Sequence, residues 1–208
     1  MSSVRLLVAT GNPGKLREIQ ALLTGLPLEV ASLADVATVE FPPEGAEYAQ
    51  NAIVKARVAA GQLGQWALAD DSGLEVDGLD GAPGAFSARY GGERLDDADR
   101  AAHLIAQLGA RPGAQRSARF VCVVALVSAS GEVHTARGEC PGTILPAPRG
   151  AGGFGYDPIF RPDGFEFSLA ELPPGVKDRI SHRGLALAQL RPLLEAISTR
   201  SRAGAELG

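Results

Sequence analysis

Short apolar runs alternate along the chain with longer segments whose apolar residues recur at helical spacing. The runs at residues 4–9 and 66–69 predict buried strands, and residues 28–33 could form another. Residues 16–23 and 47–63 place apolar side chains three and four positions apart, which predicts amphipathic helices. This alternation of strands and helices is typical of an α/β fold.

The second half of the chain contains a hairpin pattern followed by a helical one. Residues 117–128 and 132–139 are strand-like and are separated by a three-residue turn, so the sheet is expected to be mixed. A helix ending near Leu108 has Asp96 or Asp97 as its candidate cap. A last helix is expected over residues 184–198, although it contains Pro192. We predict one domain over residues 1–198, made of a mixed twisted sheet with flanking helices, and a frayed tail over residues 199–208.

Glycine and proline are more frequent than in an average protein. The 208 residues include 26 Gly and 14 Pro, a share of about 19%, which is still below the level typical of low-complexity disorder. Because 45% of the residues are hydrophobic and 21% are charged, the chain can bury a core and keep a soluble surface. The excess of glycine and proline is therefore expected in ordered loops.

Charge and composition exclude several classes of protein. A net charge of −4 with no block of five like charges argues against a nucleic-acid partner. No apolar run approaches 18 residues, and the first one is too short for a signal peptide, so we expect a cytoplasmic protein that does not enter membranes. The two cysteines form no CxxC motif and the three histidines lie far apart, which disfavours thiol and zinc chemistry.

The loop after the first predicted strand has the composition of a phosphate-binding loop. Glycines at a helix N-terminus allow backbone N–H groups to face an anion, and a lysine adds positive charge. The spacing differs from that of a Walker A loop. The alternative is a strand-to-helix turn that needs Gly and Pro for its shape alone. Lys55 could reach the same anion or be an ordinary surface lysine. The loop reads Thr10, Gly11, Asn12, Pro13, Gly14 and Lys15.

Two adjacent acidic residues, Asp70 and Asp71, follow the apolar run at residues 66–69. Ligands of α/β sheets collect at the carboxyl ends of strands, and adjacent carboxylates there favour a cation such as Mg²⁺. Since neighbouring side chains of an extended segment point in opposite directions, one aspartate is expected to face the ligand and the other to brace the loop. The alternative is an Asp-Ser-Gly turn. Glu40 and Glu44 could complete a metal site or be solvated.

A glycine-rich segment at residues 150–158 contains two aromatic residues, Phe154 and Tyr156. Glycines let the backbone approach a flat ligand, and either ring could stack on a base. Lys177, His182 and Arg183 follow and could donate hydrogen bonds to carbonyl or phosphate oxygens. The alternatives are that Ser181 caps the last helix and that His182 packs a loop. Together these residues indicate a nucleotide site.

Four segments together resemble the noncanonical purine nucleoside triphosphate pyrophosphatases, which act on inosine and xanthosine triphosphates. They are residues 10–15, 69–90 (ADDSGLEVDGLDGAPGAFSARY), 152–160 (GGFGYDPIF) and 181–184 (SHRG), and they span nearly the whole chain. The resemblance implies an elongated α/β fold with two lobes around a nucleotide-binding groove, usually in a homodimer. It also implies Mg²⁺-dependent hydrolysis of ITP, dITP and XTP to the monophosphate and pyrophosphate, which removes them from the nucleotide pool.

The resemblance also assigns roles to individual residues. Asp71 would be the general base and a metal ligand, and Lys15 would assist catalysis. The second metal ligand would be Glu40 or Glu44, because the segment before the second helix departs from the family pattern and has Gln50 where a glutamate is usual. Glu40 is favoured, since an acidic residue five positions before the glycine, here Gly45, is the commoner arrangement in the family. The implied substrate-binding residues are Thr10, Gly11, Asn12, Pro13, Gly14, Lys15, Lys55, Ser72, Phe154, Gly155, Tyr156, Asp157, Lys177, His182 and Arg183.

Two other functions fit parts of this pattern. A Maf-like nucleotide pyrophosphatase would have a related fold, but its first loop is expected to be rich in Ser and Arg, unlike residues 10–15. A non-catalytic nucleotide-binding or regulatory protein would keep the phosphate loop and lose the acidic residues, yet Asp70, Asp71 and Glu40 are all present.

Overall fold

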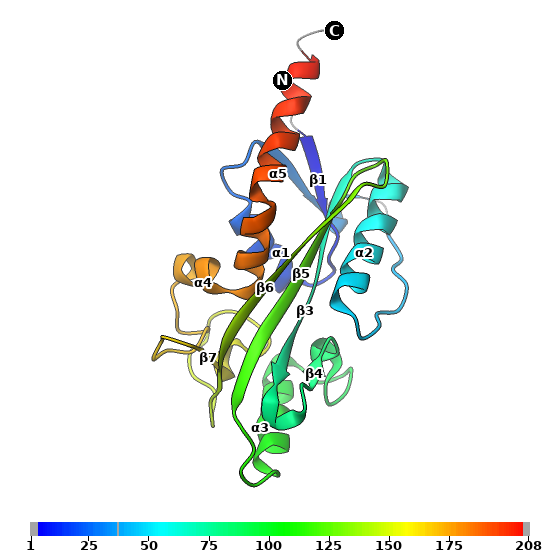
Figure 1. The fold of residues 1–208 in the computed structure, drawn as a ribbon. Helices are drawn as coiled ribbons and strands as arrows, with labels where there is room; N and C mark the ends of the chain where they lie inside the picture. The colour runs from blue at the N-terminus through cyan, green and yellow to red at the C-terminus, as the bar shows by residue number, and fades with distance from the viewer. Residues whose placement is uncertain (1–3, 37, 206–208) are drawn as a thin grey trace. The chain divides into compact units, whose positions relative to one another are not determined.

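A computed structural model describes residues 4–36 and 38–205, and the chain divides into two compact units (Figure 1). The first unit comprises the described parts of Met1–Asp71, Val123–Arg137 and Leu185–Gly208, and the second comprises Ser72–Cys122 and Gly138–Gly184. The elements of the first unit are β1 (Val4–Val8), α1 (Pro13–Leu22), β2 (Leu28–Ser32), α2 (Tyr48–Leu63) and parts of β3 (Trp66–Val76), β5 (Ser117–Val127), β6 (Val133–Ile144) and α5 (His182–Ala205).

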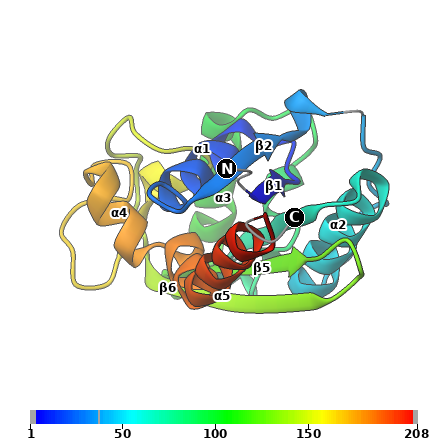
Figure 2. The same cartoon turned by 90° about the horizontal axis from the view of Figure 1, so that it is seen from above.

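The first unit is built around β1, which has a parallel strand on each side. This strand pairs in parallel with β2 on one side and with residues 66–68 of β3 on the other. The chain therefore crosses from β1 through α1 to β2 and then returns through α2 to β3. Because both crossovers are expected to be right-handed, the reversal of direction places α1 and α2 on opposite faces, and they lie on either side of β1 in Figures 1 and 2. Such a reversal is a topological switch point, where α/β sheets bind ligands beyond the carboxyl ends of the strands.

Alanines on the buried face of α2 bring this helix close to its neighbours. Ala52, Ala56 and Ala59 are fully buried, and side chains of this size leave little distance between a helix backbone and what it covers. Asn51 and Lys55 stand one turn apart on the same helix and share a face. The sequence of α2 therefore fixes the position of both polar side chains through packing.

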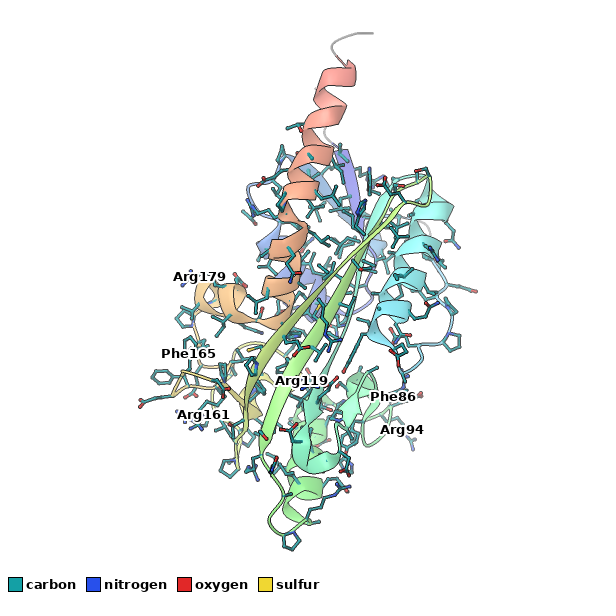
Figure 3. The ribbon with its side chains drawn as sticks, in the orientation of Figure 1. Phe86, Arg94, Arg119, Arg161, Phe165 and Arg179 are labelled. Carbon is teal, nitrogen blue, oxygen red and sulfur yellow. The ribbon has the colours of Figure 1, made fainter. Side chains whose placement is uncertain are left out.

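The second unit has its own hydrophobic core. Leu74 and Val76 from β3, Leu104 from α3 and Phe160 from β7 are among its buried residues. Across its strands, the exposed Arg119 of β5 pairs with Glu75 of β3 at 2.6 Å (Figure 3). The remaining elements of this unit are β4 (Pro83–Gly84), α3 (Asp97–Gly109), β7 (Phe160–Pro162), α4 (Pro174–Ile180) and the 3-10 turns Asp77–Leu79, Ser87–Arg89 and Asp157–Ile159.

The strands of the described residues form one mixed sheet in the order β2-β1-β3-β5-β6-β7, with β4 paired to β3. Parallel pairs flank β1, whereas β3 with β4 and β6 with β7 are antiparallel. The predicted α/β class and mixed sheet are therefore confirmed. Within residues 4–36 and 38–205, no helix has the length and hydrophobicity required to cross a membrane.

Several element boundaries differ from the sequence prediction, and the strand expected over residues 132–139 runs from Val133 to Ile144. The strand expected to stop before Asp70 continues to Val76. After its parallel pairing with β1 ends, β3 still has β5 as its neighbour in the sheet, and it pairs with β4 at Leu74 and Glu75. The last helix starts at His182 and runs to Ala205, so the part of the expected tail over residues 199–205 is helical and residues 206–208 lie outside the described residues. Pro192 is tolerated inside α5 because it and Ala188, whose carbonyl loses its donor, are both exposed.

Candidate active site

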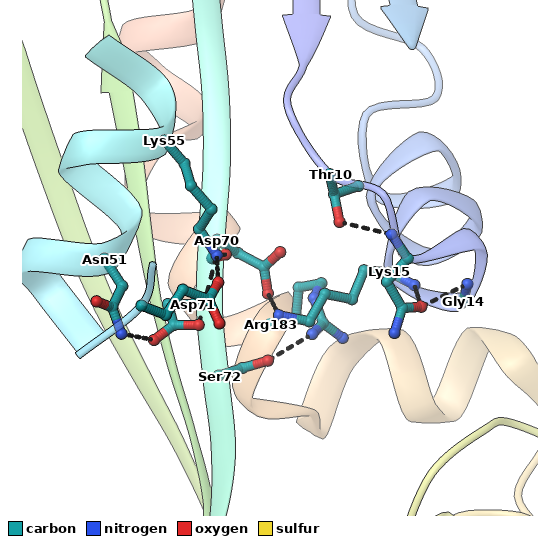
Figure 4. Close-up of polar contacts among 11 residues, drawn as sticks. Thr10, Gly14, Lys15, Asn51, Lys55, Asp70, Asp71, Ser72 and Arg183 are labelled. Carbon is teal, nitrogen blue, oxygen red and sulfur yellow. Dashed lines mark hydrogen bonds and ion pairs between the residues drawn. The ribbon is translucent and has the colours of Figure 1, made fainter. Parts of the chain in front are cut away.

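The loop between β1 and α1 is held in shape by its own side chains. The Asn12 side-chain oxygen accepts hydrogen bonds from the backbone N–H groups of Gly14 and Lys15, at 2.8 and 3.1 Å (Figure 4). Thr10 Oγ1 accepts from the Asn12 N–H at 3.2 Å. Asn12 is thus the N-cap of α1, which satisfies two of the amides that an anion could otherwise use. The loop is therefore preformed, and the charge it presents is the Lys15 ammonium.

Lys15 pairs with the first aspartate of the acidic motif. Its Nζ lies 3.2 Å from Asp70 Oδ2, and the Asp70 side chain is completely buried. A buried carboxylate is costly unless a cation compensates it. The ion pair between Asp70 and Lys15 therefore connects β3 to the candidate phosphate-binding loop at residues 10–15.

The second aspartate has a different set of partners, all from α2 (Figure 4). Asp71 Oδ2 accepts a hydrogen bond from Asn51 Nδ2 at 2.7 Å, and Asp71 Oδ1 lies 3.4 Å from Lys55 Nζ. The expected divergence of the two neighbouring carboxylates is confirmed, since Asp70 contacts α1 and Asp71 contacts α2.

Lys55 is the common partner of the acidic groups. Its Nζ donates to Glu44 Oε1 at 2.8 Å and to the backbone carbonyl of Asp70 at 2.7 Å, in addition to its contact with Asp71. Burial lowers the pKa of Lys55, but the charges of Asp70, Asp71 and Glu44 outweigh it, so the net pKa is raised. The lysine is therefore a fixed positive charge and not an ordinary surface lysine.

The surroundings of Asp71 shift the pKa of its carboxyl group. Burial raises the pKa of its carboxyl group, and Glu44 raises it further, whereas Lys55, Asn51 and Lys15 lower it; the net shift is upward. A carboxylate with a raised pKa accepts a proton more readily than one in water. Perturbed groups of this kind are enriched in catalytic sites.

The segment before α2 places Glu44, not Glu40, beside this cluster. Asn51 fixes the segment by accepting from the Gly45 N–H at 2.8 Å and donating to the Gly45 carbonyl at 2.9 Å. Glu44 consequently reaches Lys55, while Glu40 is exposed. A pocket of about 340 Å³ opens between residues 42–47 and the first turns of α2.

Glu44 at this pocket and the neighbouring Asp71 supply oxygen donors, the kind that a hard divalent cation takes. Among the described residues, no group of three or more His, Cys, Asp or Glu side chains is placed to hold a metal. Glu44 and Asp71, however, both direct a carboxylate oxygen at the Lys55 ammonium, so oxygen donors already surround one cation. Mg²⁺ is usually bound by one or two carboxylates together with water and substrate phosphates. Two protein carboxylates are therefore sufficient.

In the second unit, the buried Arg183 forms a polar pair with the partly buried Ser72. Arg183 Nη2 donates to Ser72 Oγ at 3.0 Å, and the arginine is only 1% exposed (Figure 4). The next residue, Gly73, packs so tightly against the Gly84 carbonyl that a Cβ atom would collide with it. This close approach explains why glycine follows the Asp-Asp-Ser sequence.

The glycine-rich loop carries a second charged cluster. Lys177 Nζ lies 2.6 Å from Asp157 Oδ2, and the same oxygen accepts from the Phe154 N–H at 2.9 Å. The Phe154 ring lies 5.4 Å from Lys177 Nζ and 5.8 Å from Arg183 Cζ. Phe154, Lys177 and Arg183 are thus brought together, with Asp157 bracing the first two.

The other aromatic candidates are packed into the second unit. Tyr156 belongs to its hydrophobic core, and its hydroxyl donates to the Ser87 carbonyl at 2.9 Å. His182 is 5% exposed and stacks on Phe120 with ring centroids 4.7 Å apart. The half-buried Phe154 is therefore the better placed of the two rings for stacking on a base. Ser181 caps α5, as one alternative predicted, because its Oγ accepts from the Gly184 N–H.

Two residues of this arrangement were not identified from the sequence as parts of the site. Asn51 was not singled out, although its position four residues before Lys55 on a helix was a usable signal. Asp97 was noted only as a possible cap; the cap is Asp96, and the Asp97 carboxylate instead accepts from the Gly155 N–H. That contact joins positions 58 residues apart, and no local pattern could have indicated it.

Comparisons with known proteins give one consistent match. A family model described as the Ham1 family matches residues 6–193. The chain is 50% identical over 188 residues to a dITP/XTP pyrophosphatase of Geobacter sulfurreducens, covering 90% of this chain and 94% of that protein. It is 49% identical over 199 residues to a protein of the same name from Mycobacterium tuberculosis, covering 94% and 97%. A solved HAM1 protein structure from Coxiella burnetii is 41% identical, with a TM-score of 0.83, covering 92% of this chain and 98% of that one.

Proposed function

Because the chain belongs to the Ham1 family, we propose that it hydrolyses noncanonical purine nucleoside triphosphates such as dITP, ITP and XTP to the monophosphate and pyrophosphate. The observation that carries this proposal is the pairing of Asp70 with Lys15 and of Asp71 with Lys55, just past the residues of β3 that pair in parallel with β1. These pairs combine a carboxyl group of raised pKa with two cations, which is what water attack on a polyphosphate requires.

Lys15 and Lys55 are the residues proposed to hold the triphosphate. Each is largely buried and already compensates a carboxylate, so each is oriented before substrate arrives. Preoriented charges stabilise a transition state without reorganisation during the reaction. Thr10 and Asn12 shape the loop that presents Lys15.

Asp71 is the proposed general base. It takes a proton from a water molecule as the water oxygen forms a bond to the α-phosphorus and the bond from that phosphorus to the β-phosphate bridging oxygen breaks. The electron pair of the broken bond leaves with pyrophosphate. Asn51 keeps Asp71 Oδ2 oriented, and the other oxygen faces Lys55.

Family members of this kind are generally metal-dependent, and Mg²⁺ is the proposed ion. Glu44 and Asp71 are the residues that would hold it, with Glu44 preferred to the exposed Glu40. When bound, the ion would neutralise charge on the phosphate oxygens.

Phe154, Lys177, His182 and Arg183 are proposed to recognise the base. A 6-oxo purine offers an acceptor to a fixed donor such as Arg183, whereas the adenine amine would leave that donor unpaired. Such a mismatch favours ITP over ATP by about 10²-fold or more. A homodimer is a further proposal that rests on the family resemblance, and a cytoplasmic location is one that rests on the short apolar runs of the sequence.

The proposal is tested by pyrophosphate release from a panel of nucleotides with and without Mg²⁺. We expect dITP, ITP and XTP to be hydrolysed with kcat/KM at least about 10²-fold above that for ATP, and chelation of the metal to abolish turnover. Binding without turnover would instead indicate the non-catalytic protein, and a preference for other nucleotides would favour the Maf-like activity. Either result would overturn the proposal.

A further inference from the structure

The Gly155 amide is held by a residue from a distant helix of the same unit. Its N–H donates to Asp97 Oδ2 at 2.7 Å, and Asp97 is the first residue of α3. We propose that Asp97 is a positioning residue for base recognition, acting through the loop that carries Phe154. The role in base recognition rests on the proposed function, whereas the hydrogen bond itself does not.

The loop at residues 150–157 needs such a constraint because glycine makes it intrinsically mobile. Gly150, Gly153 and Gly155 all have positive φ angles, at 79°, 73° and 59°. Glycine loses more conformational entropy on ordering than any other residue. The loop at residues 150–157 therefore needs hydrogen bonds to other side chains to hold one backbone conformation.

Two successive amides of this loop are each taken by a carboxylate. The Phe154 N–H donates to Asp157 Oδ2 at 2.9 Å from within the loop, and the Gly155 N–H donates to Asp97 from outside it. Charged acceptors make shorter and stronger hydrogen bonds than neutral ones. Asp97 therefore fixes the residue directly after Phe154 to another element.

The Phe154 ring, which these bonds position, lies near two cationic side chains. Phe154 lies within 6 Å of both Lys177 Nζ and Arg183 Cζ, a distance at which a cation still interacts with a ring face. A shift of the backbone at Gly155 would move the adjacent ring relative to both. Loss of the Asp97 bond is therefore expected to weaken base binding and leave the groups around Asp71 unchanged.

Asp97 is presented by a rigid element. Asp96 caps α3 by accepting from the Asp99 N–H at 2.8 Å. The buried Arg100 donates to the carbonyls of Tyr90 and Gly92, which fixes the segment leading into the helix. Because these bonds fix the start of α3, Asp97 itself moves little and can hold the loop it contacts in one position.

If Asp97 acted only through its negative charge, its removal would change nucleotide binding in the opposite direction. An exposed carboxylate repels an anionic nucleotide, so removal of a merely electrostatic Asp97 would strengthen binding. Removal of a positioning Asp97 would weaken it. Asp99 lies in the same helical turn, is exposed and carries the same charge, which makes Asp99→Ala a matched control.

The kinetic test compares Asp97→Ala, Asp97→Asn and Asp99→Ala with the wild-type enzyme. We expect Asp97→Ala to raise KM for ITP about three- to tenfold while kcat stays within about twofold, the size expected for one hydrogen bond. Asp97→Asn should remain near wild type because its amide oxygen accepts the same bond, and Asp99→Ala should leave KM unchanged or lower. Equal effects of Asp97→Ala and Asp99→Ala, or failure of asparagine to rescue, would overturn the proposal.

Hydrogen–deuterium exchange separates this proposal from the proposed function. The Gly155 amide should exchange several-fold faster in Asp97→Ala than in wild type or Asp99→Ala, whatever the substrate. Unchanged exchange would show that Asp97 does not hold the loop. If the wild-type enzyme hydrolyses none of the nucleotides while exchange responds as expected, the proposed function fails and the role of Asp97 in holding the loop stands.

Discussion

Asp71→Asn is expected to lower kcat for ITP by about 10²–10⁴-fold, the usual contribution of a general base. Asparagine has the same shape and keeps an oxygen that can accept from Asn51 Nδ2, but it cannot take the proton of the attacking water. Lys55 also retains Glu44 as a charged partner. The loss should therefore appear in single-turnover kinetics as a slower chemical step.

The fold of this variant provides its control. Burial raises the pKa of Asp71, so neutralising this side chain removes a desolvation cost along with its interactions. Thermal melting without metal should consequently show a native-like cooperative transition. Near-wild-type turnover by a folded Asp71→Asn protein would remove Asp71 from the role of base.

Lys55→Met is expected to reduce kcat/KM by about 10²–10³-fold, as loss of a preoriented charge in a buried site typically does. Methionine approximates the aliphatic stem of lysine but supplies no donor to Glu44 or Asp71. Arg57→Met is the matched control, because Arg57 lies on the same helix and is exposed. Steady-state kinetics with ITP should show the loss only for Lys55→Met, and equal losses would assign the effect to overall charge.

The same variant should also shift the pH dependence of the reaction. Asp71 works as a base only when deprotonated, so activity is lost as pH falls through its pKa. Lys55 lowers the pKa of Asp71, and its removal must raise it. The acidic limb of the kcat/KM profile should therefore move to higher pH in Lys55→Met and stay in place in Arg57→Met.

Local pattern predicted the elements that build the site but not the contacts that complete it. Apolar periodicity located β1, α2 and the acidic motif, because each is set by residues close in sequence. That β3 continues through Asp70 and Asp71 depends on its neighbours in the sheet, β5 and β4, which are distant in sequence and which no local window contains. The burial of Tyr156 likewise involves distant residues, since its hydroxyl donates to the Ser87 carbonyl, 69 residues away.

The choice between Glu40 and Glu44 shows the same limit. Both belong to one acidic, proline-containing segment without regular structure, so spacing alone left either available. Glu44 reaches Lys55 because Asn51 binds both backbone groups of Gly45 and so fixes the segment next to it. The family resemblance implies a metal-binding glutamate in this segment without identifying it. The side-chain contacts show that Glu44 is the one that reaches Lys55.

Hydrolysis in ¹⁸O-labelled water tests the central claim most directly, because it reports which phosphorus is attacked. With ITP and Mg²⁺, attack at the α-phosphorus places the label in IMP and leaves pyrophosphate unlabelled, which mass spectrometry of the two products distinguishes. We predict one labelled oxygen in IMP and none in pyrophosphate after a single turnover. Label in pyrophosphate, or release of IDP and inorganic phosphate, would contradict the account.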